Sequence, residues 1–346
     1  MKNLPIILVL LSLLTLPVQA VQLEAPTVPS SGEEFMPEKT DSLGEALMEM
    51  LETLFSQLRS LSAPAAETGA QVLAASLLLS VVSVWEGRSS LPVKPVGALA
   101  GCALLLGSSK SMLQLAANTI QELTDYGKLL FPVMTTAMAA QGGVTTSAAL
   151  YAGTMILDTV LASLISGVML PAVSGFLALG VGFAVTGEDI LKRMRDFVRN
   201  GIAWFLKALL TVFTAYMSIT GVVSGTTDTA ALKATKVTIS TVVPVVGSVL
   251  SDASEAVLVS TGIVRNAAGI YGILAILAVF LVPFLEIGAQ YLVLKATASL
   301  CMILDAGGLR EVVEDASTAM GLLLAMTGTV CLLLLISTVC FLKGVG

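Results

Sequence analysis

The sequence predicts an all-α fold, a polytopic membrane protein with about nine transmembrane helices and one re-entrant or interfacial helical hairpin. Of the 346 residues, 55% are hydrophobic and only 12% are charged, about half the charged fraction of a soluble domain. The mean hydropathy is +0.92, and the apolar residues form long blocks rather than short periodic runs. The net charge is −6 and the sequence has no basic tract, so we expect no nucleic-acid partner. The lipid bilayer is the expected surrounding.

Several kinds of chemistry find no support in the sequence. The chain has no histidine, which removes histidine bases, catalytic triads and histidine metal ligands. No Walker A, GxSxG, HExxH or GxGxxG pattern is present. The four cysteines lie in apolar segments without CxxC spacing, which favours buried apolar side chains over a metal site or a disulfide framework: Cys102, Cys301, Cys331 and Cys340. We therefore expect no enzyme, no cofactor and no metal.

The amino-terminal part is predicted to lie outside the cytoplasm. Residues 1–20 combine Lys2, a short apolar run and a small-residue exit at Ala20, the pattern of a signal peptide, although an uncleaved anchor is the alternative. Residues 21–69 are interpreted as an extracytoplasmic linker followed by an amphipathic helix. Its apolar stripe comprises Leu43, Leu47, Met50, Leu54, Leu58 and Leu61. This helix either docks a partner or lies on its own membrane or bundle.

Residues 70–346 are predicted to form the multi-span membrane domain. At about 20 residues per crossing, residues 129–187 alone fit three spans. The other predicted spans are 70–85, 96–117, 201–224, the pair 267–283 and 284–304 joined by a tight turn near Pro283–Glu286, and 316–342.

Basic residues set the predicted orientation. The segment 188–200 carries four cations and should lie in the cytoplasm under the positive-inside rule. Five crossings after an external amino terminus reach the same side. The acidic segment 305–315 is then predicted outside, and the carboxyl terminus in the cytoplasm.

Four ionisable residues interrupt apolar blocks, where charge is costly and often functional. Asp158 lies centrally in its block, while Lys207, Glu286 and Lys295 lie nearer the ends of theirs. Either Asp158 and Glu286 carry ions or protons in a transporter, or the lysines snorkel, Glu286 lies in a turn and Asp158 bonds to a neighbouring helix.

The segment 225–266 is unlike the rest of the membrane domain because it balances three cations against three anions. Its charged residues are Asp228, Lys233, Lys236, Asp252, Glu255 and Arg265. Only 15 residues without charge separate Lys236 from the next acid, too few to span a bilayer. Pro244 and Gly247 should break a helix at its middle. A re-entrant or interfacial hairpin is therefore predicted here.

These residues also carry a family likeness. The pattern D-x-x-A-L-K-x-x-K, then P-V-V-G-x-x-L-S-D-A, then R-N-x-x-G resembles the stage III sporulation protein AE family from about residue 125 onward, and weakly across 21–100. The motif positions are Asp228, Lys233, Lys236, Pro244, Gly247, Asp252, Arg265 and Asn266. The resemblance attaches no catalytic role to them, and they are candidates for partner contacts or for lining a path.

The resemblance implies a role in endospore formation. Members of the family are multi-pass proteins of the mother-cell membrane around the forespore. The implied partners are the other membrane proteins of the stage III sporulation A operon and, indirectly, the forespore protein Q of stage II. Together they would form a channel that supports late forespore development. The alternative from the residues is a secondary transporter or permease that uses intramembrane acids such as Asp158.

Overall fold

The computed structural model describes residues 25–37, 43–85, 93–141, 143–242, 247–304 and 307–343. Side chains within these ranges are described except at 83–85, 93, 220–242, 247–265, 307 and 343. Every regular element in the described residues is a helix. In chain order they are η1 (Glu33–Phe35), α2 (Leu43–Trp85), α3 (Val93–Ala140), α4 (Val144–Leu164), the π-helical η3 (Ile165–Met169), α5 (Leu170–Thr186), α6 (Asp189–Val242), α7 (Gly247–Ile303) and α8 (Gly307–Lys343).

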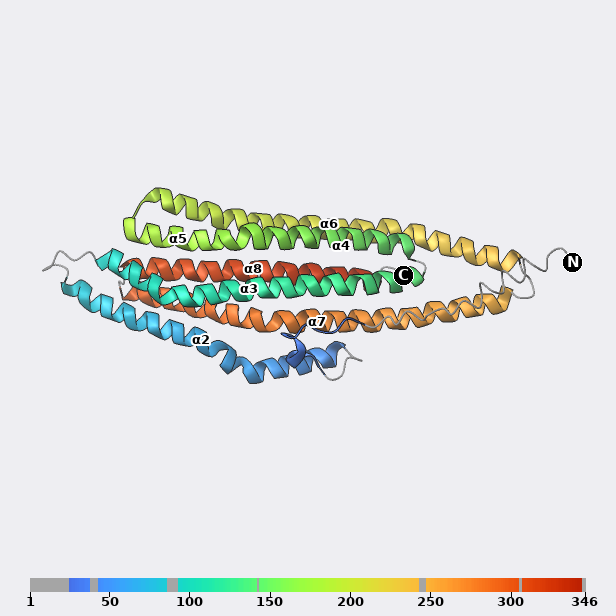
Figure 1. Cartoon of the computed structure of the whole chain (residues 1–346), viewed down its shortest axis with the longest axis horizontal. Helices are drawn as coiled ribbons and strands as arrows, with labels where there is room; N and C mark the ends of the chain where they lie inside the picture. The colour runs from blue at the N-terminus through green and yellow to red at the C-terminus, as the bar shows by residue number, and fades with distance from the viewer. Residues whose placement is uncertain are drawn as a thin grey trace.

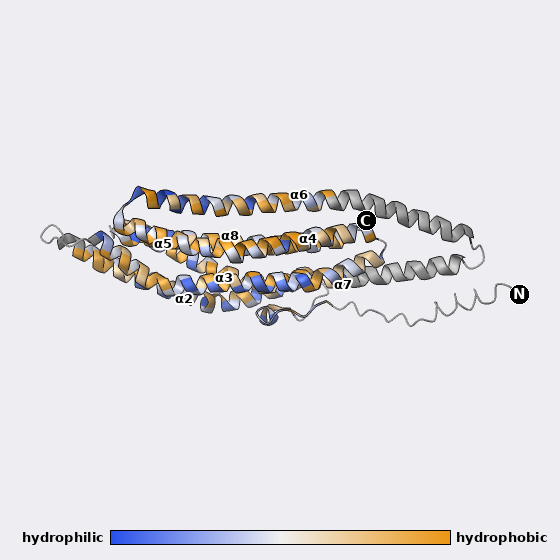
Figure 2. Cartoon of the chain, turned by 45° about the horizontal axis from the view of Figure 1, so that its top comes forward, coloured by the Kyte–Doolittle hydropathy of each residue, from blue (hydrophilic) through white to orange (hydrophobic). Residues whose placement is uncertain are grey.

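The helices form one elongated bundle in which their long axes run roughly side by side (Figure 1). Helix α8 contacts α3, α4, α5, α6 and α7 and is the central helix of the bundle. Its sequence explains this position, because residues 316–342 carry no charge and an all-round apolar helix is stable only when it is surrounded by other helices or lipid. Hydrophobic residues dominate α4, α5 and α8, whereas the start of α6 is hydrophilic (Figure 2).

Six helices of the described residues are long and apolar enough to cross a membrane, and the predicted count of nine is not confirmed. The difference arises because the number of spans in a long apolar stretch was obtained by dividing its length by the length of one crossing. Residues 129–187, predicted as three spans, contain the end of α3 and one continuous rod formed by α4, η3 and α5. The π-helical turn in this rod directly precedes Pro171, which has no backbone N–H to donate.

The predicted tight turn near Pro283 is wrong, because α7 passes through Pro283 without ending. A proline removes one hydrogen bond from a helix, and neighbouring helices make this loss tolerable within a membrane bundle. The predicted amphipathic helix and the first predicted span are likewise joined in the single helix α2.

Helix α6 is described as far as Val242 and α7 from Gly247, on either side of the predicted break. The described parts of the predicted hairpin, residues 225–242 and 247–266, do not form an element of their own. The chain instead continues α6 and α7 to lengths of 54 and 57 residues. Residues 243–246, with Pro244, lie outside the described part of the chain.

The two ends of the bundle differ in charge. The end of α2, the start of α3, the α5–α6 turn at Gly187–Glu188 and the start of α8 lie at one end (Figure 1). We call this the basic end, because four cations follow the α5–α6 turn within residues 188–200. The α3–α4 junction and the last residues of α8 lie together toward the other end, called the C-terminal end, and α6 and α7 extend beyond them.

This arrangement corrects the predicted sides of two segments. Residues 188–200 and 305–315 were expected on opposite sides of the membrane, but Arg195 and Asp315 are in direct contact at the basic end. Helix α8 then runs from this end to the C-terminal end. The 188–200 segment and the carboxyl terminus therefore cannot both be cytoplasmic if α8 crosses the bilayer. The opposite sides were predicted because three crossings were counted in residues 267–342, where the structure has two helices, α7 and α8.

Candidate functional site: a charged cavity between α5, α6 and α8

The α5–α6 turn places a basic segment against the start of α8. Helix α5 ends at Gly187, whose φ of 71° lies in the left-handed region that suits glycine. Helix α6 begins two residues later with Asp189, an acid that suits a helix start. Because α6 returns alongside α5 and α8 (Figure 1), its second turn brings Arg195 to the inner side of the bundle.

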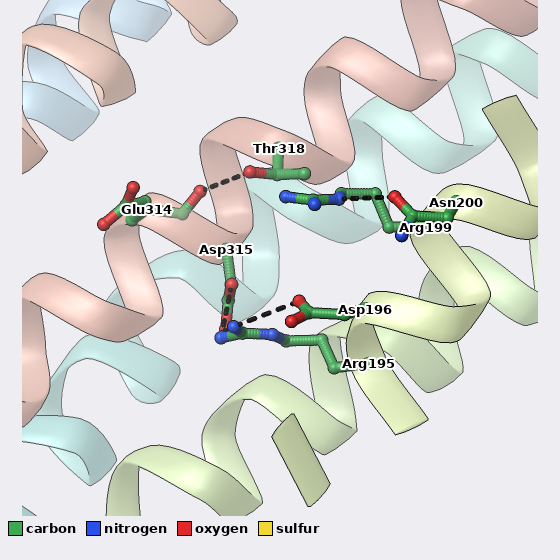
Figure 3. Close-up of polar contacts among 7 residues, drawn as sticks. All are labelled: Arg195, Asp196, Arg199, Asn200, Glu314, Asp315 and Thr318. Carbon is green, nitrogen blue, oxygen red and sulfur yellow. Dashed lines mark hydrogen bonds and ion pairs between the residues drawn. The ribbon is translucent and has the colours of Figure 1, made fainter. Parts of the chain in front are cut away.

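Arg195 and Asp315 form the best-buried ion pair in the described residues. Nη1 of Arg195 donates to both carboxylate oxygens of Asp315, at 3.0 and 2.9 Å. The exposed fractions of the two side chains are 14% and 9%. Nη2 of Arg195 also donates to Asp196 at 3.3 Å (Figure 3). Charge-assisted hydrogen bonds with so little exposure to solvent hold α6 and α8 in a fixed register.

An aromatic ring supports the same arginine. The guanidinium carbon of Arg195 lies 5.4 Å from the ring centre of Phe183 on α5, and Nζ of Lys192 lies 5.8 Å from it. Both distances are within the range of cation–π attraction. The pair therefore joins three helices, since α5 supplies the ring, α6 the cations and α8 the acid.

Gly180 makes the close approach of α5 and α8 possible. A Cβ atom at this position would collide with the carboxylate of Asp315, so every residue except glycine would displace the acid or the helix. The fully exposed side of α5 has no such requirement, because nothing lies within 4 Å of a Cβ built at Gly175. We infer that Gly180 is needed for packing and not for chain flexibility.

The ion pair forms part of the wall of a polar cavity of about 250 Å³. Its charged lining comprises four cations and four anions, namely Lys192, Arg195, Arg199, Arg310, Asp196, Glu311, Glu314 and Asp315. Nη2 of Arg310 lies 3.9 Å from Oε2 of Glu314. Arg199 donates a hydrogen bond from Nε to Oδ1 of the neighbouring Asn200 (Figure 3). This composition suits water and ionic contacts. It does not resemble a nucleophile held beside a base.

Sequence reasoning missed Asp315 as a site residue. A usable signal was present, because Asp315 lies on the same face of α8 as Val312, Ala316 and Ala319, all of which are buried. An acid on the buried face of a helix requires a cation from another element. The basic segment 188–200 is the richest source of cations in the chain.

Asp158 is buried in α4, with an exposed fraction of 4%. Its nearest glycine is on α3, where a Cβ built on Gly127 would lie 3.6 Å from the Asp158 carboxylate. Neither carboxylate oxygen has a hydrogen-bond partner among the described residues. The predicted bond to a neighbouring helix is therefore not seen. One turn away, Thr154 donates to Ser337 of α8 at 3.4 Å.

The other ionisable residues predicted within apolar blocks lie closer to the surface. Lys207 and Lys295 are exposed on α6 and α7, and Glu286 is half-buried. The turn predicted for Glu286 does not exist, because α7 is continuous there. The structure brings none of these three into the cavity that contains Arg195 and Asp315.

The family-motif residues are distributed along two helices. Asp228, Lys233 and Lys236 belong to α6, and Gly247, Asp252, Arg265 and Asn266 belong to α7. Asn266 is exposed, whereas the side chains of the other six and Pro244 lie outside the described residues. Their assignment to partner contacts or to a path remains a prediction.

Comparison with known proteins agrees with the sequence likeness and extends it. The family described as Stage III sporulation protein AE matches residues 33–344, so the match includes most of the amino-terminal part where the likeness was weak. Stage III sporulation protein AE of Bacillus subtilis (strain 168) is 22% identical over 204 residues, which cover 59% of this chain and 51% of that relative. The matched part is thus about half the length of the relative. No solved structure matches the chain. A match along nearly the whole helical bundle places this chain in the stage III sporulation protein AE family.

Proposed function

We propose that this protein is a non-enzymatic integral-membrane subunit of a channel complex between mother cell and forespore, needed for late forespore development. The observation that carries the proposal is the family match over residues 33–344. Its partners would be the other membrane proteins of the stage III sporulation A operon and, indirectly, the forespore protein Q of stage II. The protein would serve as a membrane core for that assembly.

The site geometry supports a structural role. The charged cavity described above is held by an ion pair with little exposure, and its charges balance. Such a site fixes the positions of helices. It offers no activated nucleophile and no acid–base pair aimed at a substrate.

We further propose that the basic end faces the mother-cell cytoplasm. The cations of the described residues in or beside the junctions at this end are Lys94, Lys192, Arg193, Arg195, Arg199 and Arg310. The α3–α4 junction, residues 141–143, has none, and the end of α8 has one, Lys343. The positive-inside rule then places the carboxyl terminus in the space outside the cytoplasm, in place of the cytoplasmic position predicted from the sequence.

Cysteine labelling tests this orientation in cells that express the full chain with its four natural cysteines replaced. Val345→Cys should react with a membrane-impermeant maleimide in intact spheroplasts, whereas Arg193→Cys should react only after lysis. The reverse pattern would overturn the proposed orientation.

The function is tested by purifying the tagged full chain from sporulating cells in mild detergent. The expected result is co-purification of other proteins of the same operon in a fixed ratio, and loss of late forespore gene expression when the chain is deleted. Normal sporulation without the chain would contradict the proposal.

A second candidate function has one observation in its favour. Asp158 is a buried carboxylate without a described partner, as expected of an ion- or proton-coupled transporter. The two functions are distinguished by reconstituting the purified chain alone in liposomes. Proton-driven uptake that Asp158→Asn abolishes would support the transporter, and absence of uptake would support the channel subunit.

A further inference from the structure

Five of the described helices, α2, α3, α6, α7 and α8, are longer than a membrane is thick. Helix α3 has 48 residues and is therefore about 72 Å long at 1.5 Å per residue. The hydrocarbon core of a bilayer is about 30 Å thick, and about 40–45 Å with the headgroup regions. A large section of the bundle must stand in water beyond the bilayer, and the amino-terminal segment identifies which section it is.

Residues 25–37 lie along the bundle as an extended segment with one short 3-10 turn. Ser31 donates a hydrogen bond to Glu122 of α3, and Gln57 of α2 donates to Glu34 at 2.8 Å. Glu33 and Glu34 are exposed. Non-helical backbone is not tolerated where a chain faces hydrocarbon, because its polar groups find no partners there. The level of Glu122 and Gln57 is therefore in water.

The section from this level to the basic end has the thickness of a bilayer. On α3, the distance from Lys94 to Glu122 is about 42 Å, and on α7 the distance from Val279 to Ile303 is about 36 Å. Val279 belongs to the same level, because it contacts Gly32 of the amino-terminal segment. The bilayer thus fits the section beside the basic end, and the first half of α2 stands in water.

This first half of α2 has two apolar faces. The inner face packs on α7, where Met50 and Leu54 form one buried cluster with Leu274 and Ala278. The outer face carries Met48, Leu51, Phe55 and Leu58, with exposed fractions of 69%, 42%, 72% and 40%. Their spacing of three, four and three residues aligns them in one stripe. A continuous apolar stripe left in water is typical of an interaction surface.

The charge beside the stripe indicates what it binds. Glu45, Glu49 and Glu52 follow each other at steps of four and three, and all three side chains are exposed. They form an acidic row along one edge of the outer face. Helix α2 runs alongside α7 in the bundle (Figure 1), so its outer face is turned sideways and does not rest on the membrane surface. Anionic lipid would also be repelled by the acidic row.

We propose that the outer face of α2 from Glu45 to Leu58 is a docking surface for a helix of another protein outside the cytoplasm. That helix would present an apolar face to the stripe and lysine or arginine residues to the acidic row, in the manner of a helix packed into a groove. The inference goes beyond the proposed channel role. The surface itself is inferred from the position of the amino-terminal segment and not from the sporulation assignment, and the side outside the cytoplasm rests on the orientation proposed above.

Binding of a defined probe tests the proposal. The full chain is placed in nanodiscs of zwitterionic lipid and titrated with two synthetic amphipathic peptides that share one leucine face. In one peptide lysines flank this face, and in the other glutamates do. The lysine peptide should bind at least about tenfold more tightly, and Phe55→Glu should weaken it at least about tenfold, as expected for a central aromatic contact.

Two control variants separate a specific loss from general damage. Leu129→Glu changes a similarly exposed residue on α3, with an exposed fraction of 59%, and should leave binding unchanged. Replacing Glu45, Glu49 and Glu52 together by glutamine should reduce the salt dependence of binding. Equal binding of the two peptides, or equal loss with Leu129→Glu and Phe55→Glu, would overturn the proposal.

Three other results would also overturn it. The first is concentration-dependent dimerisation of the full chain that Phe55→Glu removes, since the stripe would then bind a second copy. The second is attachment of the stripe to added vesicles. The third concerns the water level. Glu52→Cys should react with an impermeant maleimide in nanodiscs. Leu78→Cys should not react, although the exposed fraction of Leu78 in the wild type is 69%. Protection of Glu52→Cys would contradict the proposal.

Discussion

Asp315 and Asp158 are two buried acids in the same bundle with opposite surroundings. Each lies beside a glycine of a neighbouring helix, Gly180 for Asp315 and Gly127 for Asp158. Asp315 accepts two hydrogen bonds from Arg195, whereas Asp158 has no partner among the described residues. The charge of Asp315 is therefore compensated by a contact between two helices. For Asp158 the described residues provide no such contact.

The difference shows how a buried charge can serve packing or remain available. A buried pair is strongly sensitive to the loss of one member, because the remaining charge has neither water nor partner. An unpaired buried carboxylate must have its charge cancelled by a proton or a cation, and it contributes little to helix register. The two sites should thus respond differently to comparable substitutions.

The largest expected effect comes from removing the cation of the paired site. Arg195→Ala should lower the free energy of unfolding by about 3–5 kcal/mol, because it leaves Asp315 buried and unpaired. Titration of the purified protein from mild detergent into sodium dodecyl sulfate measures this change. Arg193→Ala, at an exposed position on the same helix, should change it by less than about 0.5 kcal/mol.

The double variant Arg195→Met with Asp315→Ala sharpens this test. Since it removes both charges, it should recover a large part of the lost stability. Equal destabilisation by the single and the double variant would mean that Arg195 acts through its packing on Phe183 and not through the ion pair.

A smaller effect is expected at the glycine beside the paired acid. Gly180→Ala introduces a methyl group against the Asp315 carboxylate and should cost about 1–3 kcal/mol through overpacking. Gly175→Ala on the same helix meets nothing within 4 Å and should be neutral or stabilise the helix by up to about 1 kcal/mol. The same detergent titration compares both variants, and similar losses would argue against the close approach of α5 and α8.

The smallest effect is expected at the unpaired acid. Asp158→Asn keeps the size of the side chain and removes a charge that has no described partner. The free energy of unfolding should stay within about 1 kcal/mol of the wild type or rise, because no paired charge is left behind. A loss as large as that of Arg195→Ala would reveal a partner for Asp158 and remove the contrast between the two sites.

The sequence predicted the class of fold and several of its local features. Apolar length and the absence of histidine pointed to a helical membrane protein without histidine chemistry. The break near Pro244 and Gly247 was predicted from local backbone chemistry, and the described parts of α6 and α7 lie on either side of it. The stripe with Met50 and Leu54 was also recognised, and these two side chains do pack on the bundle.

Other features depended on contacts between distant residues. Hydropathy could not separate one long rod from several short spans, so residues 129–187 were divided too often. It also could not place residues 188–200 and 305–315 at the same end, because the ion pair between Arg195 and Asp315 joins residues 120 positions apart. The outer stripe with Met48 and Phe55 was missed because two adjacent apolar faces on one helix blur a single periodic pattern.

The sequence by itself determined that this chain is a helical membrane protein and that it resembles one family. Composition, local propensity and the order of motifs do not depend on tertiary contacts. The tertiary structure decided which acid is paired, which ends of the helices meet and which face of α2 stays uncovered. These outcomes depend on how long helices pack against each other, and a one-dimensional pattern of hydropathy contains no information on that register.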